Sequence, residues 1–182
     1  MFWDFLTPFI SVGLAELGDK TQLALIFLAA ETKNKWKLLV GAIMAFLVVD
    51  GLAVVLGAVA STLIPHAAVK TASGLLFILF GILMLKSAEH QKPRVLAGNP
   101  LFSAFTLICV AEFGDKTQLA TAAFASTRNP LIVLAAAMTA LTLISAAAVY
   151  FGEKISGRLE PRKTSIIAGT IFITIGAATL LT

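Results

Sequence analysis

The sequence predicts an all-α integral membrane protein whose six transmembrane helices form two inverted three-helix repeats. Three observations support this fold class. The chain has 182 residues, of which 58% are hydrophobic and 13% charged, and its mean hydropathy is +0.93, whereas soluble domains carry about 25% charged residues. Its apolar runs reach the roughly 20 residues that a helix needs to cross a bilayer. A ten-residue polar motif also occurs twice, once in each half of the chain.

Six apolar segments define the predicted helices. They lack the alternation of apolar and polar residues that a transmembrane barrel strand shows, so each is interpreted as a helix. Polar breaks separate the segments, and only the break after the third is long enough to be a linker. The predicted spans are residues 5–30, 38–64, 67–85, 101–125, 131–152 and 164–181.

The two halves of the chain are copies of one unit. An offset of 95 residues pairs Gly57 with Gly152, Ser61 with Ser156, Gly74 with Gly169, Phe77 with Phe172 and Gly81 with Gly176. Because each unit has three helices, the second copy must enter the membrane from the opposite side, as in transporters built from inverted repeats. The predicted division is a first repeat over residues 1–87, a cytoplasmic linker over 88–99 and a second repeat over 100–182.

Lysine and arginine residues predict the orientation in the membrane, because they collect in cytoplasmic loops. The loops between the predicted helices lie alternately on two sides of the membrane. The loops on one side, predicted to be cytoplasmic, hold ten basic residues: Lys33, Lys35, Lys37, Lys86, Lys92, Arg94, Lys154, Arg158, Arg162 and Lys163. The loops on the opposite side hold only Lys70 and Arg128, and the repeated motif holds the remaining two lysines. Both termini are therefore predicted to lie outside the cytoplasm. The net charge of +4 follows from this topology, and no nucleic-acid partner is inferred from it.

The repeated motif is the candidate functional site. One copy runs from Ala15 to Ala24 and the other from Ala111 to Ala120, and they differ only by Leu or Phe at the third position. On a continuous helix the glutamate and aspartate of each copy share a face. Four such acids in a membrane cost about 10 kcal/mol together, which protons, a counter-ion or water must offset. The four acids are Glu16, Asp19, Glu112 and Asp115.

The groups around these acids predict a site for a hard cation. Each copy adds a glutamine amide, a threonine hydroxyl and a glycine that can break the helix and free carbonyl oxygens. These residues are Gln22, Thr21 and Gly18 in the first copy and Gln118, Thr117 and Gly114 in the second. An oxygen-only set without His, Cys or Met suits Ca²⁺, Mn²⁺ or Mg²⁺ and does not suit Zn²⁺ or Cu⁺. The four acids and the two glutamines are the predicted metal ligands.

Lys20 and Lys116 enter the charge balance of the motif. If all six ionisable groups are charged and close together, a net charge of −2 remains. One divalent cation or two protons would neutralise it, so competition between them gives a physical basis for exchange. Alternatively, each lysine extends to a water interface or pairs with the glutamate four residues before it.

Two features lie outside the motif. Gly74 and Gly81 are seven residues apart, as are their counterparts in the second repeat, and this spacing predicts close packing between membrane helices. Asp50 lies inside an apolar span, whereas its counterpart is Ser145. A membrane aspartate is a functional-site candidate, so Asp50 is interpreted as an accessory proton or cation group, or equally as a polar contact between helices.

The doubled Glu-apolar-Gly-Asp-Lys-Thr motif resembles the signature of the Golgi and bacterial cation/proton antiporter family, which includes bacterial manganese exporters. The resemblance covers the whole chain. It implies export of Mn²⁺ or Ca²⁺ from the cytosol in exchange for protons, with no bound cofactor and with the cation held by the four acids of the motif. The compact form resembles a bacterial member, which implies the inner membrane.

Three other classes of function compete with exchange. The same acids could line a divalent-cation channel. They could also serve a membrane-embedded metal-assisted hydrolase, although no nucleophile with a base accompanies them and the duplication has little use in an enzyme. A helical scaffold would gain nothing from four acids inside the membrane. We therefore expect a transporter and not an enzyme, in which the two halves alternate about a site at the midplane of the bilayer.

Overall fold

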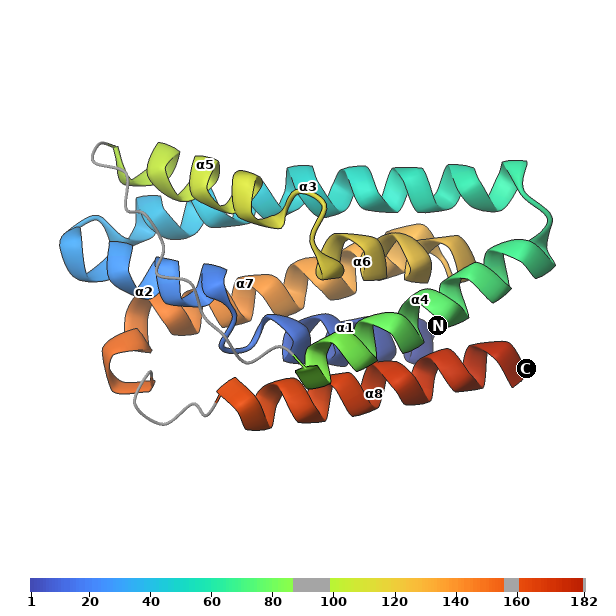
Figure 1. The fold of residues 1–182 in the computed structure, drawn as a ribbon. Helices are drawn as coiled ribbons and strands as arrows, with labels where there is room; N and C mark the ends of the chain where they lie inside the picture. Colours follow the sequence, from blue (N-terminus) through green and yellow to red (C-terminus); the bar gives the residue numbers. More distant parts are fainter. Residues whose placement is uncertain (87–98, 156–160, 182) are drawn as a thin grey trace.

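A computed structural model of the chain describes residues 1–86, 99–155 and 161–181, and these residues form eight helices and no strand (Figure 1). The helices are α1 (Phe2–Glu16), α2 (Lys20–Glu31), α3 (Lys35–Leu63), α4 (His66–Lys86), α5 (Pro100–Glu112), α6 (Lys116–Thr127), α7 (Pro130–Ile155) and α8 (Pro161–Leu181). The predicted all-α fold is therefore correct. The linker predicted at 88–99 lies outside the described residues except for Asn99, whose side chain caps α5.

Two of the six predicted helices are each divided into two. The span predicted at 5–30 consists of α1 and α2, and the span at 101–125 consists of α5 and α6. Each break contains a glycine with positive φ, 80° at Gly18 and 79° at Gly114, a conformation that other residues rarely adopt. Asp19 and Asp115 cap the helices that follow. The expectation that glutamate and aspartate share a face of one continuous helix is therefore wrong, because they belong to different helices.

Within the described ranges, two helices are long and apolar enough to cross a membrane. The most apolar stretch within α3 has a mean hydropathy of 2.6 and that within Pro130–Gly152 of α7 has 2.3, and the shorter apolar helices are Ala67–Leu83, Pro100–Glu112 and Ile166–Leu181. One face of α3 leaves a row of large apolar side chains about half exposed, which suits contact with lipid. This row consists of Met44, Leu47, Val48, Leu52, Val55, Leu56 and Val59.

Helices α4 and α8 form an antiparallel pair at their glycines. Gly74 lies against Gly176, and Gly81 lies against Gly169. A Cβ atom added at Gly81 would lie 2.6 Å from the carbonyl oxygen of Gly169, and one added at Gly176 would lie 2.6 Å from that of Gly74. The predicted close packing at these glycines is therefore confirmed.

The packing of the two halves is only partly symmetric. By sequence, α1 to α4 correspond to α5 to α8. Helix α3 packs on α5 and α6, and its counterpart α7 packs on α1 and α2. However, α4 packs on α6 and α8 packs on α1, while among the described helices α8 does not pack along α2, nor α4 along α5. The α4–α8 pair thus packs on α1 and α6 and leaves α2 and α5 without an equivalent contact among the described helices.

The chain termini lie at one end of the molecule, and the α2–α3 turn lies at the other (Figure 1). Two buried apolar clusters fill the interior. The first contains Leu25 and Leu28 of α2, and the second contains Ala120 and Phe124 of α6. The second cluster also contains Ala15. Because Ala15 and Ala120 belong to the two copies of the motif, this cluster borders the paired motifs.

Candidate cation site at the paired motifs

At each break between helices, the glycine N–H is hydrogen bonded to the glutamine side chain of the same motif copy. The Gly114 N–H donates to Gln118 Oε1 at 2.7 Å, and the Gly18 N–H donates to Gln22 Oε1 in the same way. The backbone also turns here, because the Asp19 N–H donates to the Glu16 carbonyl at 3.1 Å. The glutamines, expected as cation ligands, therefore use their carbonyl oxygens to hold the breaks in this conformation.

The lysines of the motif form ion pairs that cross between the halves. Lys116 Nζ lies 2.6 Å from Asp19 Oδ2, and Lys20 Nζ lies 3.1 Å from Asp115 Oδ2. The Lys116 pair is the more buried, with side-chain exposures of 29% and 18% against 41% and 21%. Neither lysine pairs with the glutamate four residues before it, so that interpretation is wrong. Each aspartate is balanced by a lysine from the other repeat.

Neither motif glutamate forms an ion pair with a lysine among the described residues. Glu16 and Glu112 are each 2% exposed, and their carboxylates lie close enough to interact electrostatically. The Thr21 hydroxyl donates to Glu16 Oε2 at 3.1 Å, and the Thr117 hydroxyl, from the other repeat, donates to Glu16 Oε1. Glu112 Oε1 is buried and has no hydrogen-bond partner among the described residues. A buried acceptor without a donor is costly, which makes this oxygen the strongest candidate ligand for a cation or proton.

The acids are not closed into a metal-binding cluster in this conformation. Among the described residues, no three His, Cys, Asp or Glu side chains lie close enough together to hold a metal ion. The lysine ammonium groups occupy the positions beside the two aspartates. The structure therefore brings the four predicted acids together in two classes: two aspartates in ion pairs and two glutamates that carry the unbalanced charge.

Asp50 lies on α3 against the helix that carries the second motif. The Thr121 hydroxyl donates to Asp50 Oδ1 at 2.9 Å, and Gln118 Nε2 donates to the carbonyl of Val49 at 3.1 Å. Asp50 is 2% exposed. Sequence reasoning missed Thr121, although it lies four residues after Thr117 and therefore on the same helix face. Its counterpart in the first repeat is Leu25, which has no polar group.

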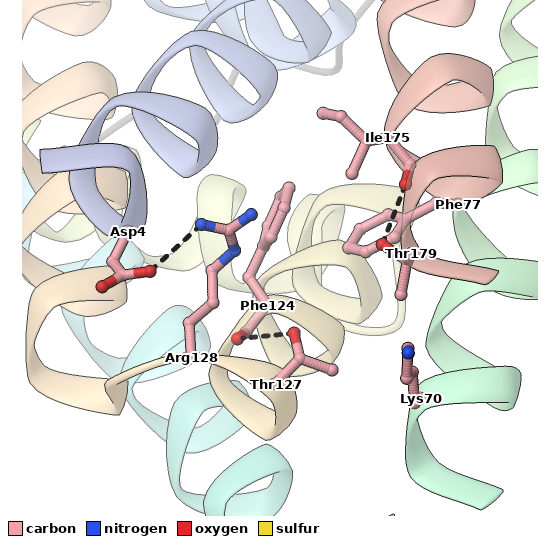
Figure 2. A pocket seen from close by; sticks show the side chains of 8 residues that line it. All are labelled: Asp4, Lys70, Phe77, Phe124, Thr127, Arg128, Ile175 and Thr179. Atoms are coloured by element: carbon pink, nitrogen blue, oxygen red, sulfur yellow. Dashed lines mark hydrogen bonds and ion pairs between the residues drawn. The ribbon is translucent and has the colours of Figure 1, made fainter. Parts of the chain in front are cut away.

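A cavity of about 360 Å³ opens at the end of the bundle that carries the termini (Figure 2). Arg128 reaches across it and donates to Asp4 Oδ1 at 3.2 Å and to the Trp3 carbonyl at 3.0 Å. Phe77 and Phe124 also line it, with ring centroids 4.5 Å apart. Phe124 lies seven residues, about 10 Å along a helix, beyond Thr117. These rings therefore stand between the cavity and the paired motifs.

Comparison with known proteins identifies the family of the chain. A family model described as the divalent cation/proton antiporter GDT1 matches residues 4–92 and 100–182, which include both copies of the motif. The chain belongs to the GDT1 family. The GDT1-like protein sll0615 of Synechocystis is 28% identical and is covered over 94% of both chains. A GDT1-like protein of Schizosaccharomyces pombe is 28% identical over 95% of this chain and 82% of its own length. No solved structure matches the chain.

Membership of the GDT1 family makes this chain a membrane-embedded transporter of divalent cations. The GDT1-like protein 5 of rice is also 28% identical and is covered over 92% of this chain and 90% of its own length. The match therefore extends over nearly the whole chain rather than over the motif alone. The apolar face of α3 and the buried acids of the motif now have one explanation, since an ion pathway needs polar groups inside a lipid-facing bundle.

Proposed function

We propose that this GDT1-family chain exports Mn²⁺ or Ca²⁺ from the cytosol in exchange for protons. The observation that carries the proposal is the separation of the four motif acids into two classes. Asp19 and Asp115 form ion pairs with Lys116 and Lys20, while the buried Glu16 and Glu112 form no ion pair within the described part of the chain. The unbalanced charge of −2 therefore lies on two neighbouring glutamates, one from each repeat.

Exchange follows from the cost of that charge. One divalent cation neutralises both glutamates, and two protons do the same. A doubly charged empty site is expensive inside the membrane, so the protein changes conformation when it carries either the cation or the protons. Oxygen donors surround the site, with Thr21 and Thr117 beside Glu16, and such donors suit Ca²⁺ and Mn²⁺.

Alternating access of the two halves would carry the loaded site across the membrane. In this proposal the chain crosses the bilayer six times, and the two three-helix repeats run in opposite directions. The antiparallel α4–α8 pair supports this arrangement, because a two-fold relation exchanges its two glycine contacts. The one-sided packing of α4 on α6 and of α8 on α1 supports a closed gate at the end with the termini.

The basic α2–α3 turn at the other end supports a cytoplasmic position for that end.

The gate can be defined by residues. The Ser73 and Ser126 hydroxyls lie 3.1 Å apart between α4 and α6, beside the packed rings of Phe77 and Phe124. If the two halves exchange roles, the residues that correspond to these four gate residues in the other repeat meet instead. Ala168 of α8 then approaches Ala30 of α2, and Phe172 packs on Leu28. The second conformation is therefore open at the termini and closed at the cytoplasmic end.

Vesicles that contain the purified protein test exchange directly. An imposed pH gradient is expected to drive Mn²⁺ or Ca²⁺ flux, with an opposite change in internal pH recorded at the same time. The Glu112→Gln variant removes one of the two unbalanced charges and is expected to abolish both signals. A cation flux indifferent to the pH gradient contradicts exchange and favours a channel.

Paired cysteines test alternating access. Cys109, the only cysteine in the sequence, is first replaced by serine. Ser73→Cys with Ser126→Cys is expected to cross-link the gate and stop transport until the disulfide is reduced. Ala30→Cys with Ala168→Cys is expected to cross-link the other conformation during turnover. Full transport with the first pair cross-linked contradicts the gate.

A further inference from the structure

We propose that Asp50 carries one additional proton in each exchange cycle and so makes transport electrogenic. This inference rests on the proposed function. The two motif glutamates bind one divalent cation or two protons, which alone gives an electrically neutral exchange. A third proton on Asp50 gives three protons in for each divalent cation out. One net positive charge then enters the cytosol in every cycle.

The surroundings of Asp50 suit a proton and do not suit a divalent cation. Helices α2, α4, α5, α6 and α7 contact α3, and the described side chain that hydrogen bonds to the Asp50 carboxylate is Thr121 of α6. Asp50 takes part in none of the ion pairs found in the described part of the chain. Calcium needs six to eight oxygen ligands, whereas a proton needs one acceptor. A single carboxylate beside one hydroxyl therefore fits a proton.

Asp50 is connected to the glutamate site through one face of α6. Thr121 donates to Asp50, and Thr117, one turn earlier, donates to Glu16. The charged and titratable groups nearest along this connection are Glu16 and Lys116, which pairs with Asp19. Thr117 and Thr121 are one helical turn, about 5.4 Å, apart. Across that separation in the protein interior a cation at the glutamates favours the charged form of Asp50, so its arrival promotes loss of the Asp50 proton. Proton loading of the glutamates has the opposite effect.

The asymmetry of the repeat supports a role distinct from the cation site. The cation-site acids occur in both repeats, whereas the counterpart of Asp50 is Ser145 and the counterpart of Thr121 is Leu25. The aspartate and its hydroxyl donor are therefore present together in one half and absent together from the other. A proton-binding group is needed only once per cycle, so a single copy is sufficient.

The membrane potential provides the test. A potassium gradient with valinomycin sets the membrane potential of the vesicles. The initial rate of Mn²⁺ or Ca²⁺ uptake driven by an outward proton gradient is then measured at each potential. A positive interior is expected to accelerate uptake by the wild-type protein, because net positive charge leaves the vesicle. Asp50→Asn keeps an oxygen that accepts from Thr121 but cannot bind the proton. It is expected to continue exchange with a rate that no longer depends on potential.

Asp50→Glu is the matched variant, because it restores an acid at the same position. It is expected to regain dependence on potential. Potential dependence that survives in Asp50→Asn overturns the inference, as does wild-type exchange that is indifferent to potential. An Asp50→Asn protein that folds, as judged by its elution and melting temperature, but no longer binds the cation also overturns it. Wild-type vesicles without any pH-coupled flux would instead reject the proposed function itself.

Discussion

The two copies of the motif have almost the same sequence but different surroundings. Glu16 accepts hydrogen bonds from two threonines, one from each repeat, whereas Glu112 Oε1 is buried without a partner among the described residues. The crossed pairs of Lys20 with Asp115 and Lys116 with Asp19 follow the repeat symmetry. Charge balance is therefore symmetric, while hydrogen bonding to the glutamates is not.

The difference arises from contacts outside the ten repeated residues. Helix α6 is tied to α3 by Thr121 on Asp50 and by Gln118 on Val49. The counterparts of Asp50 and Thr121, Ser145 and Leu25, cannot make the equivalent bond. In the proposed alternating-access cycle only one of the two ends is open at a time, so a conformation that is open at one end is also asymmetric. A duplicated sequence can thus supply two unlike halves of one site.

The glutamates should give the largest effect. Loss of a charged ligand contact worth about 3 kcal/mol weakens cation affinity roughly 100-fold, so Glu16→Gln and Glu112→Gln are each expected to abolish measurable exchange. The melting temperatures of the two variants compare the surroundings of the two glutamates. Glu112→Gln removes a buried carboxylate that has one oxygen without a hydrogen-bond partner among the described residues. It is expected to raise the melting temperature in detergent, while Glu16→Gln gains less. Equal shifts would indicate that the two glutamates have equivalent surroundings.

The crossed ion pairs should give an intermediate effect. Lys116→Met leaves Asp19 without its partner at a part-buried site and is expected to slow exchange about tenfold, since charged hydrogen bonds contribute about 1.5–3 kcal/mol. Lys20→Met acts on a longer and more exposed pair, which contributes about 1 kcal/mol or less, so a few-fold loss is expected. Initial rates in vesicles measure both.

Reversing the Lys116 pair tests whether it acts through charge. The double variant Asp19→Lys with Lys116→Asp is expected to recover part of the rate lost in Lys116→Met. A larger loss in Lys20→Met than in Lys116→Met would contradict the ranking of the two pairs by burial.

The threonines should give the smallest effect. A neutral donor removed from a carboxylate costs about 1 kcal/mol or somewhat more, roughly a fivefold change. Thr117→Val is expected to weaken cation binding more than Thr21→Val, because the Thr117 hydrogen bond joins the two repeats. Thr174→Val, on an exposed position of α8 where the hydroxyl bonds only to its own helix, is the matched control. Equal effects of Thr21 and Thr117 would remove the distinction between local and crossing contacts.

The sequence identified the acids that the structure brings near one another, but not how their surroundings differ. Glu16, Asp19, Glu112 and Asp115 could be selected because ionisable groups are rare inside apolar spans. The motif glycines Gly18 and Gly114 also predicted where two spans break, although the apolar pattern alone shows each span as one continuous helix. The partners of Lys20 and Lys116 could not be predicted, because they lie on the other repeat and depend on how the halves meet. Thr121 was missed because a single threonine in an apolar helix gives no signal until its partner is known.

The most direct test of a shared site is the number of cations that each chain binds. Titration of the detergent-solubilised protein with Mn²⁺ or Ca²⁺, with proton release measured in parallel, is expected to give one cation per chain. Either Glu16→Gln or Glu112→Gln alone should abolish that binding, because both glutamates hold the same ion. Two cations per wild-type chain, or one cation still bound after either substitution, would contradict a site made from both repeats.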